Sequence, residues 1–440
     1  MQVSRREKEL VMERRTFVKS AAGAVAAQGM AFAASSRVLG ANDRIRVAVL
    51  GVNGRGKSHI AGFEALDNVE VVTLVDPDRK IAEQRAAGFE GRYGRKPAIE
   101  QDLRRVLDDQ SIDCIGIATP NHWHALAAIW GCQAGKDVYV EKPGAHSIYE
   151  GRQLVAAAKK YNRIVQHGVQ LRSSVAMREG IQLLRDGIIG DIYLGRACIF
   201  KWRPSVGKRP SAAAPAHIDW NMWQGPAEER EFSTRYVHYN WHWHWDYGNG
   251  DIGNQGIHET DLMLWGLGVG LPDEVMAMGG KFLWDDDKET PETMTALLKW
   301  KKENIMCEIA VRPWSSNYED GVRVGNIFYG SKGFMLMRTY NSYEVYFGAN
   351  RDPGPKGDFG GDHYANFIKA VRSRKTSDQH GPVETAHTSS SVAHIANIAL
   401  LANRKLDFDP ETERFVNDDE ANSYLRRKAS RKGFEVPENV

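Results

Sequence analysis

Short apolar runs recur along the first 170 residues, and most are followed by a segment of helical composition. The runs lie at 45–50, 69–75, 112–118, 138–140 and 164–169. Uninterrupted apolar runs of this length are typical of strands that a parallel sheet buries on both faces. Helical segments are expected at 59–66, 80–89, 103–107, 125–134 and 148–160. Strand and helix alternate over short loops, which predicts an α/β fold with a doubly wound parallel sheet of the Rossmann type.

The pattern changes after about residue 169. Strand-like runs become longer and lie closer together, at 192–202, 274–283, 293–299, 305–311, 322–329 and 334–337. An aromatic-rich loop at 203–250 separates the first two, and the charged tail from Asp407 is expected to be irregular and surface-lying. This texture predicts an α+β domain with a mostly antiparallel, open sheet. The expected division is a leader and linker at 1–43, a nucleotide-binding domain at 44–169 and an α+β domain at 170–440.

Composition narrows the possible functions. A chain of 440 residues exceeds one ordinary core, in keeping with two domains. Its net charge is +2 and it has no basic stripe interleaved with aromatic residues, so nucleic acid is not an expected partner. The four cysteines lie far apart without C-x-x-C spacing and are expected to be buried free thiols. No segment after the leader approaches the length of a membrane span.

The N-terminal segment has the features of an export signal. Residues 14–19 (RRTFVK) precede a weakly apolar, alanine-rich stretch at 20–34, which is too short for a stable membrane span. This order predicts a twin-arginine signal, with the twin-arginine translocase as partner during export and a periplasmic or otherwise exported location. A helical or disordered N-terminal extension is the alternative.

A glycine turn follows the first strand, and an acidic residue ends the second. In Gly51-x-x-Gly54-x-Gly56 the first glycine suits a tight turn and the last suits close helix–strand packing. Asn53 stands where the common G-x-G-x-x-G motif has its second glycine, and it tolerates left-handed backbone angles. Asp76 can accept hydrogen bonds from both ribose hydroxyls and would repel a 2′-phosphate, which predicts NAD in preference to NADP. A solvated Asp before a turn is the alternative.

A lysine follows the fourth strand, where the crevice of such a sheet opens. Lys142 lies between Glu141 and Pro143, and burial at this point would bring its ammonium group close to a ribose, a nicotinamide and a substrate. It could then hydrogen-bond a substrate hydroxyl and help the proton to leave. A surface lysine in a turn is the alternative.

A second set of polar residues lies at 253–261 (GNQGIHETD). Asn254 and His258 are spaced i, i+4 and would share one face of a helical turn, with Asp261 close to one turn further along. The spacing suits a proton acceptor, His258, and an amide that orients it. A histidine with a purely structural hydrogen bond is the alternative.

Residues 238–247 (HYNWHWHWDY) are unusually dense in rings. Tryptophan and tyrosine faces stack on sugar rings while His, Asn and Asp pair with hydroxyl groups, so a sugar-facing wall is expected. If the run is extended, alternate side chains face opposite sides, and His242 and His244 would both face the site. One alternative is aromatic core packing. The other is metal binding by the His-x-His pairs at 122/124 and 242/244, but each lacks a well-spaced third ligand, so no metal is expected.

The chain closely resembles the Gfo/Idh/MocA oxidoreductase family in its exported bacterial branch. The strings that carry the resemblance are 55–56 (RG), 117–124 (IATPNHWH), 140–143 (VEKP), 219–227 (DWNMWQGPA) and 253–261. They span roughly residues 44–267, and the remainder follows the family's usual strand order. The resemblance implies the two-domain fold, bound NAD and, by analogy, a homo-oligomer.

The resemblance also implies roles for single residues. The pyrophosphate would be held by Gly51, Gly54, Arg55 and Gly56, and the adenosine ribose by Asp76. The cofactor crevice would be lined by Thr119, Pro120, Asn121, His124 and Glu141. Lys142 resembles the family's catalytic lysine and His258 its acid–base histidine. Asn254 stands where many members carry Asp, so Lys142 is expected to carry more of the proton transfer. The candidate substrate contacts are Gln170, Arg172, His242, Trp243, His244 and Asp261.

Three functions follow. The leading hypothesis is an exported NAD(H)-dependent oxidoreductase that oxidises a hydroxyl of a sugar or glycoside and retains its cofactor. The first alternative is an NAD-dependent glycosidase or lyase that works by oxidation, elimination and reduction. Exported glycosidases of the family resemble this chain in the glycine turn and in Trp123-His124, but they generally lack the lysine of the EKP tripeptide. The second alternative is a non-catalytic carbohydrate-binding protein on the same fold, against which the intact lysine and glycine turn argue.

Overall fold

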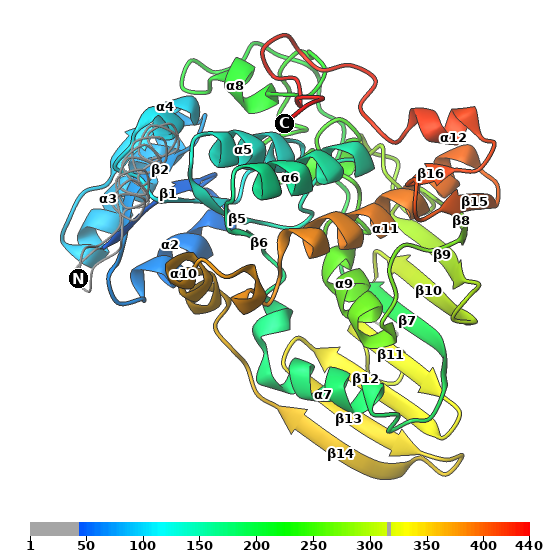
Figure 1. Cartoon of the computed structure of the whole chain (residues 1–440). Coiled ribbons are helices and arrows are strands. Elements are labelled where there is room, and N and C mark those ends of the chain that lie inside the picture. The colour runs from blue at the N-terminus through cyan, green and yellow to red at the C-terminus, as the bar shows by residue number, and fades with distance from the viewer. Residues whose placement is uncertain (1–43, 315–317) are drawn as a thin grey trace, which may run out of the picture. The chain divides into compact units, whose positions relative to one another are not determined.

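The first of two sheets has six parallel strands in the order β3-β2-β1-β4-β5-β6 (Figure 1). The structure, a computed structural model, describes residues 44–314 and 318–440, so the predicted leader lies outside the described residues. The strands are β1 (Ile45–Leu50), β2 (Val69–Val75), β3 (Ala98–Glu100), β4 (Cys114–Ile117), β5 (Asp137–Val140) and β6 (Val165–His167). The Rossmann-type sheet predicted from the apolar runs is confirmed.

Helices cover both faces of this sheet. One face carries α4 (Arg104–Asp108), α5 (Asn121–Gln133) and α6 (Ile148–Lys160). The other carries α2 (Gly56–Glu64), α3 (Arg79–Tyr93) and the late helix α10 (His363–Ser373). Side chains of β1 alternate between the two cores, since Ala48 and Leu50 belong to the first and Val47 and Val49 to the second. Burial on both faces explains why the strand is an uninterrupted apolar run.

The second sheet has ten strands in the order β14-β13-β12-β11-β7-β10-β9-β8-β15-β16. Neighbouring strands are antiparallel, except that β7 and β10 run parallel. Its strands are β7 (Ile192–Phe200), β8 (Glu274–Gly280), β9 (Thr293–Trp300), β10 (Ile305–Arg312), β11 (Val324–Gly330), β12 (Gly333–Thr339), β13 (Ser342–Phe347), β14 (Asp352–Asp358), β15 (Leu406–Asp409) and β16 (Arg414–Phe415). The predicted mostly antiparallel second sheet is confirmed.

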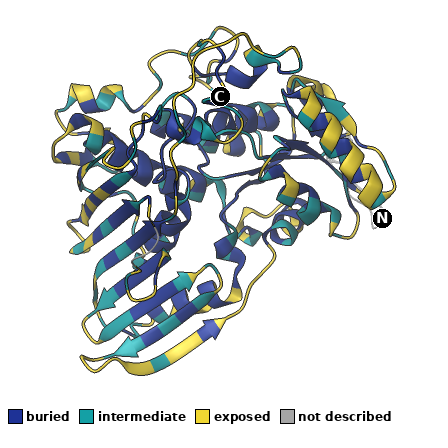
Figure 2. Cartoon of the chain, turned by 180° about the vertical axis from the view of Figure 1, so that it is seen from behind, coloured by how far each residue is buried: buried dark blue, intermediate teal, exposed yellow. Residues whose placement is uncertain are grey.

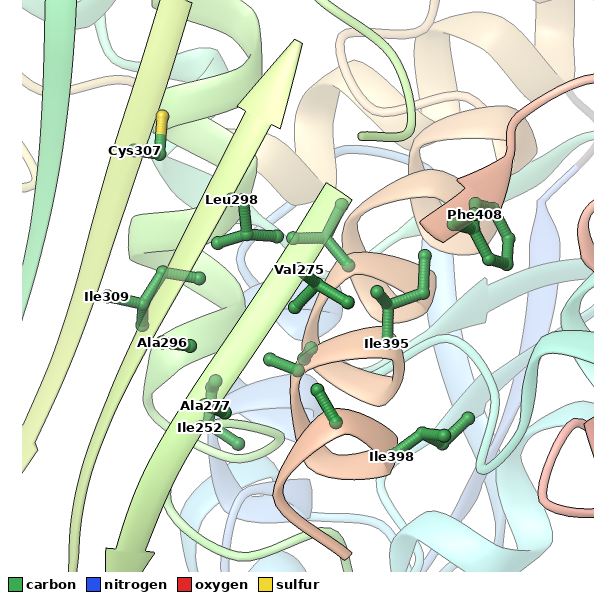
Figure 3. Close-up of a cluster of buried hydrophobic side chains, with 14 of the residues drawn as sticks. Ile252, Val275, Ala277, Ala296, Leu298, Cys307, Ile309, Ile395, Ile398 and Phe408 are labelled. Atoms are coloured by element: carbon green, nitrogen blue, oxygen red, sulfur yellow. The ribbon is translucent and has the colours of Figure 1, made fainter. Parts of the chain in front are cut away.

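Helices α7 (Val175–Arg185), α9 (Gly256–Leu267) and α11 (Val383–Ala402) pack on one face of this second sheet. Helix α11 also contacts α6 and β6, so it joins the two sheets, and the helices around it are largely dark blue in Figure 2. Figure 3 shows Ile395 and Ile398 of α11 in the same buried cluster as Val275 of β8 and Leu298 of β9. On the opposite face, Met276 and other side chains of β8 and β9 are exposed, as expected of an open sheet.

Two segments differ from the sequence expectation. The tail after Asp407 is not irregular throughout, because β15 pairs with β8 and β16, and α12 (Asp419–Ser423) follows. Phe434 then returns to the first core, where its ring lies edge-on to Trp123 with centroids 5.7 Å apart. The tail is mostly charged, so its composition did not indicate that Phe408, Phe415 and Phe434 would be buried. Strand β3 was not expected because it is three residues long and none of them is fully buried.

Further expectations concern single residue types. All four cysteines are buried and free, as predicted. Within the described ranges, no helix is long and apolar enough to cross a membrane. In the same ranges, no group of three His, Cys, Asp or Glu side chains is placed to hold a metal ion.

Candidate active site

A cavity of about 450 Å³ lies at the carboxyl ends of β1, β2, β4 and β5. One wall is formed by the turns that follow these strands. The facing wall comes from the end of β7, the start of α9 and the loop at 203–250, which contains α8 (Trp220–Gln224) and a 3₁₀ turn, η2 (Asn240–Trp243). Parallel sheets bind ligands at this edge, where the strand order reverses, here between β1 and β4.

The glycine turn has the geometry that its sequence predicts. Gly51 has φ +80°, and a Cβ there would lie 2.6 Å from the Ala118 carbonyl oxygen, so only glycine fits. A Cβ on Gly56 would lie 2.0 Å from the carbonyl oxygen of Gly51. Gly54 lines the cavity, and a Cβ on it would meet no protein atom within 4 Å. Asn53 keeps a negative φ, so the left-handed backbone that its residue type allows is not used here.

The residues around this turn fit a dinucleotide. Helix α2 starts at Gly56 with no side-chain cap, and the positive end of its dipole therefore lies at the glycine turn, where it favours a phosphate. The N–H groups of Lys57 and Ser58 already donate to the carbonyl oxygens of Gly54 and Arg55, at 3.2 and 2.8 Å. Thr119 Oγ1 is buried at the cavity wall with no hydrogen-bond partner among the described residues. At the far end, Asp76 accepts from the N–H groups of Val52 and Asp78, each at 3.0 Å, and keeps lone pairs for ribose hydroxyls. Burial raises the pKa of Asp76 to about 6.

A partly buried ion-pair network links the glycine turn to the lysine loop. Arg55 Nε donates to Glu141 Oε1 at 2.7 Å, and His59 Nε2 donates to the same oxygen at 3.2 Å. Burial opposes ionisation of Glu141, but the charge of Arg55 and the His59 hydrogen bond hold its pKa well below the ordinary value. The Arg55 guanidinium, which is expected to hold the pyrophosphate, therefore also pairs with Glu141.

Lys142 is held by a neutral residue. Its Nζ donates to Asn254 Oδ1 at 2.9 Å and to the Asn254 carbonyl oxygen at 3.1 Å. Burial lowers the pKa of Lys142 to about 8, and this loss is offset only in part by Glu141. A carboxylate in place of the Asn254 amide would pair with the ammonium group and raise that pKa. The amide was expected to orient His258, and the structure shows that it orients Lys142 instead.

Two histidines complete this part of the cavity. His258, on α9, lines the cavity, and its Nδ1 is buried without a partner among the described residues. Burial, followed by the nearby charge of Lys142, holds the pKa of His258 well below its ordinary value, so the ring is neutral. His124 lies between two carbonyl oxygens, with Nε2 2.8 Å from that of Thr119 and Nδ1 facing that of Pro143. It joins the turn after β4 to the lysine loop, and Pro120 and Asn121 line the cavity beside it.

The aromatic loop does not have the expected alternation. Because η2 is a 3₁₀ turn and not an extended strand, His242 and His244 point in different directions. His242 and Trp241 line the cavity, with their rings stacked at 3.5 Å. His244 is buried against Tyr236 outside the cavity, so the prediction that both histidines face the site is wrong. Trp243 is also buried away from the cavity, beneath the guanidinium of an arginine of the same loop.

Of the other candidate substrate contacts, only Gln170 lines the cavity. With its amide nitrogen facing the Gly168 carbonyl, it accepts from Arg55 Nη2 at 3.1 Å. Arg172 and Asp261 pair with each other behind the cavity wall, at 2.7 Å (Nε–Oδ2) and 3.0 Å (Nη2–Oδ1). Neither lines the cavity. Their polarity suggested a substrate, but it serves a buried ion pair.

Two family models match the chain. One, described as an oxidoreductase family with an NAD-binding Rossmann fold, matches residues 45–169. The other, described as the oxidoreductase family's C-terminal alpha/beta domain, matches residues 182–275 and 353–436. The chain belongs to the Gfo/Idh/MocA oxidoreductase family. It is therefore an oxidoreductase with NAD as its cofactor, and the predicted family is confirmed, whereas the exported branch of that family stays a prediction.

Other proteins resemble this family member over different lengths. An uncharacterized oxidoreductase of Streptococcus pneumoniae is 24% identical over 68% of this chain and 69% of its own length. A glycosyl hydrolase family 109 protein of Shewanella pealeana is 30% identical over 35% of each chain, so the match spans about a third of that relative.

Solved structures share the fold of this Gfo/Idh/MocA protein at low sequence identity. The WlbA dehydrogenase from Bordetella pertussis, in complex with NADH and UDP-GlcNAcA, aligns with a TM-score of 0.63 at 20% identity, over 83% of this chain and 99% of that one. A levoglucosan dehydrogenase, in complex with NADH and levoglucosan, aligns with a TM-score of 0.62 at 17% identity over the same shares.

Several cavity residues of this family member were not among the sequence candidates. Lys201 follows β7, Gln255 precedes α9, and Tyr340 lies between β12 and β13. These three residues are far apart in the sequence, and the hydrogen bonds among them join positions up to 85 residues apart. The adjacency of Gln255 to Asn254 was the one signal available in the sequence.

Proposed function

We propose that this protein oxidises a hydroxyl group of a sugar or glycoside, with NAD as the acceptor. The observation that carries the proposal is the half-buried Lys142, which lines the cavity at the end of β5 and donates to the neutral amide of Asn254. Bound NAD supplies the acceptor for the hydride that leaves the hydroxyl-bearing carbon. Trp241 and Tyr239 line the facing wall, and aromatic rings of this kind stack on sugars.

Lys142 is the group we assign as proton acceptor. A general base works best when its pKa lies near the operating pH, and burial brings the pKa of Lys142 to about 8. Its neutral fraction rises as the pH approaches 8, so it takes the hydroxyl proton more readily there. Asn254 supports this role because it positions Nζ without adding a negative charge.

His258 has a supporting role in this proposal. Burial and the nearby charge of Lys142 lower the pKa of His258, which makes its ring a weaker base than Lys142. A neutral imidazole in the cavity wall can hydrogen-bond the reacting hydroxyl and fix its direction. The proton therefore passes to Lys142 Nζ while His258 holds the oxygen.

A direct test begins with the cofactor content of the purified protein, followed by absorbance at the reduced-nicotinamide band during incubation with a panel of sugars and glycosides. The proposal expects reduction with at least one of them, and a rate that rises towards pH 8. A protein that holds NAD and reduces none of it with any sugar, glycoside or sugar acid contradicts the proposal.

Redox-neutral cleavage of a glycoside is the second candidate. It is favoured by the 30% identity, over 161 residues, to a protein named as a glycosyl hydrolase. The two reactions separate in one experiment with a chromogenic glycoside. Cleavage releases the aglycone without lasting NADH, whereas net oxidation accumulates NADH with the glycosidic bond intact.

We further propose that the chain is exported by the twin-arginine translocase. The support is residues 14–19 (RRTFVK) ahead of the alanine-rich stretch. An exported enzyme of this kind has little free NAD to draw on, so it is expected to fold around its cofactor first and to retain it. The homo-oligomer implied by the family resemblance stays a prediction.

A further inference from the structure

A second lysine faces the same cavity as Lys142. Lys201 follows the last residue of β7, lines the cavity, and donates from Nζ to Gln255 Oε1 at 2.9 Å. Its partner is thus a neutral amide. Within the described ranges, no Asp or Glu side chain lies at ion-pairing distance from the Nζ of either lysine.

The two lysines are presented together. Lys142 rests on Asn254 and Lys201 on Gln255, and these amides are consecutive residues in the turn before α9. The positive charge of Lys201 is near enough to contribute to lowering the pKa of Lys142. Two ammonium groups in one partly buried space repel each other, and an anion placed between them relieves that repulsion.

Nearby carboxylates offset these charges only in part, since burial still lowers the pKa of Lys142 against the effect of Glu141 and that of Lys201 against the effect of Asp251. Asp251 is itself paired with Arg203. Glu141 is engaged by Arg55 and His59, and Asp76 lies at the opposite, adenosine end beside the turn after β2. Glu259 is buried behind Tyr340, whose hydroxyl donates to its Oε1 at 3.0 Å. Burial raises the pKa of Glu259 to about 8, so it is mostly protonated and neutral at pH 7.

The remaining polar groups at this end add no negative charge. The histidines His242 and His258 are kept neutral by burial, and Gln170 is an amide. Tyr239 adds no negative charge either, because it presents a hydroxyl group that accepts a hydrogen bond from Arg203 Nη1 at 2.9 Å. The substrate end of the cavity is therefore cationic.

We propose that Lys201 is a specificity-determining residue that binds a carboxylate of the substrate, so that the substrate class is sugar acids. The inference rests on the proposed function, because it places the reacting hydroxyl at Lys142 and the carboxylate at Lys201. One lysine then acts on the reaction and the other selects the substrate. A charged hydrogen bond of this kind changes binding by about 10-fold to 100-fold.

The first test measures binding and does not depend on turnover. Glucuronate and its neutral methyl ester are titrated calorimetrically into the purified full chain with its NAD. The inference expects glucuronate to bind about 10-fold to 100-fold more tightly than the ester, with the difference abolished in Lys201→Gln and kept in Lys201→Arg. Lys299→Gln, a change at an exposed lysine of β9, is the matched control and keeps the difference.

Equal binding of acid and ester, no binding of glucuronate, or an unchanged preference in Lys201→Gln overturns the inference. Turnover on the same pair separates this result from failure of the proposed function. If neutral sugars are oxidised as readily as sugar acids, the carboxylate claim is wrong while the oxidoreductase proposal stands. If glucuronate binds with the expected selectivity and no sugar is oxidised, the proposed function fails while Lys201 remains an anion-binding residue.

Discussion

Removal of Arg172 is expected to destabilise the fold and to leave substrate affinity nearly unchanged. Sequence reasoning placed Arg172 and Asp261 on the substrate, whereas the structure pairs them out of the cavity. The side chain of Asp261 is fully buried and that of Arg172 is 13% exposed. Asp261 also accepts from Ser389 Oγ at 2.6 Å, and the Arg172 guanidinium lies 4.8 Å from the ring centre of Trp265.

The magnitude follows from the charge left behind. Arg172→Met removes one partner of a buried pair and leaves the Asp261 carboxylate without its counter-charge, which costs about 3–5 kcal/mol. With an unfolding entropy of about 2.1 cal/mol/K per residue, this loss corresponds to a Tm lower by roughly 4–6 °C for a unit of this size. The double variant Arg172→Met with Asp261→Asn removes the buried charge and should recover much of that loss.

Thermal unfolding of the wild type, the single variant and the double variant measures the effect, and KM for a turned-over substrate is determined on the same preparations. Arg79→Met is the control, because Arg79 and Glu83 form an exposed pair whose loss should shift Tm very little. A large rise in KM for Arg172→Met with an unchanged Tm would refute the structural assignment and restore the substrate role.

Three further predictions can be checked separately. Asp76→Ala should narrow the preference for NAD over NADP by about 1–3 kcal/mol. At pH values below about 6, where Asp76 is protonated, the wild type should bind NAD more weakly. Calorimetry with both dinucleotides measures both effects, and equal affinity of the wild type for NAD and NADP would remove the argument. Trp241→Ala should raise KM with little change in Tm. Replacement of the buried Trp243 by Ala should instead lower the free energy of unfolding by about 3–5 kcal/mol, and Tm with it. The reverse pattern in kinetics and thermal unfolding contradicts the loop geometry. Replacing Arg14 and Arg15 by Lys should keep the protein in the cytoplasm, and export seen in cell fractionation despite the change would disprove the signal.

The fold was predictable from the sequence where strands are buried on both faces. The run at 69–75 (VEVVTLV) and its neighbours give a signal that does not depend on distant contacts. Strand β14 (Asp352–Asp358) is different, since it contains Pro353 and Gly354 and is mostly exposed. Its place is set by pairing with β13, which local composition does not encode.

The sequence was sufficient to predict those site residues that directly follow a strand of the parallel sheet. Lys142 and Asp76 each follow a strand of the parallel sheet, so topology alone brings them to one edge. Lys201 follows β7 of the other sheet, and its place in the cavity depends on the packing of α9 against β7, which brings Gln255 beside it. His244 shows the opposite failure, because the assumed extended backbone is a 3₁₀ turn and a one-residue step no longer alternates the faces.

The pairing of Lys142 with a neutral amide also emerged only from the structure. The sequence showed Asn254 four residues before His258, a spacing that suggested a partnership between those two. In the structure Asn254 lies before the first residue of α9. Its side chain accepts a hydrogen bond from Lys142, which follows β5 of the parallel sheet. Helical spacing is informative only once both residues are known to lie within the helix.

The central claim is that Lys142 takes the proton of the reacting hydroxyl. Single-turnover reduction of bound NAD by a sugar substrate tests it most directly, when wild type and Lys142→Met are compared and NAD occupancy is determined on the same preparations. The account predicts near-normal NAD occupancy in the variant and hydride transfer slower by about 10²–10⁴-fold, the usual contribution of one proton-transfer group. Near-normal hydride transfer in the folded, NAD-loaded variant would contradict it.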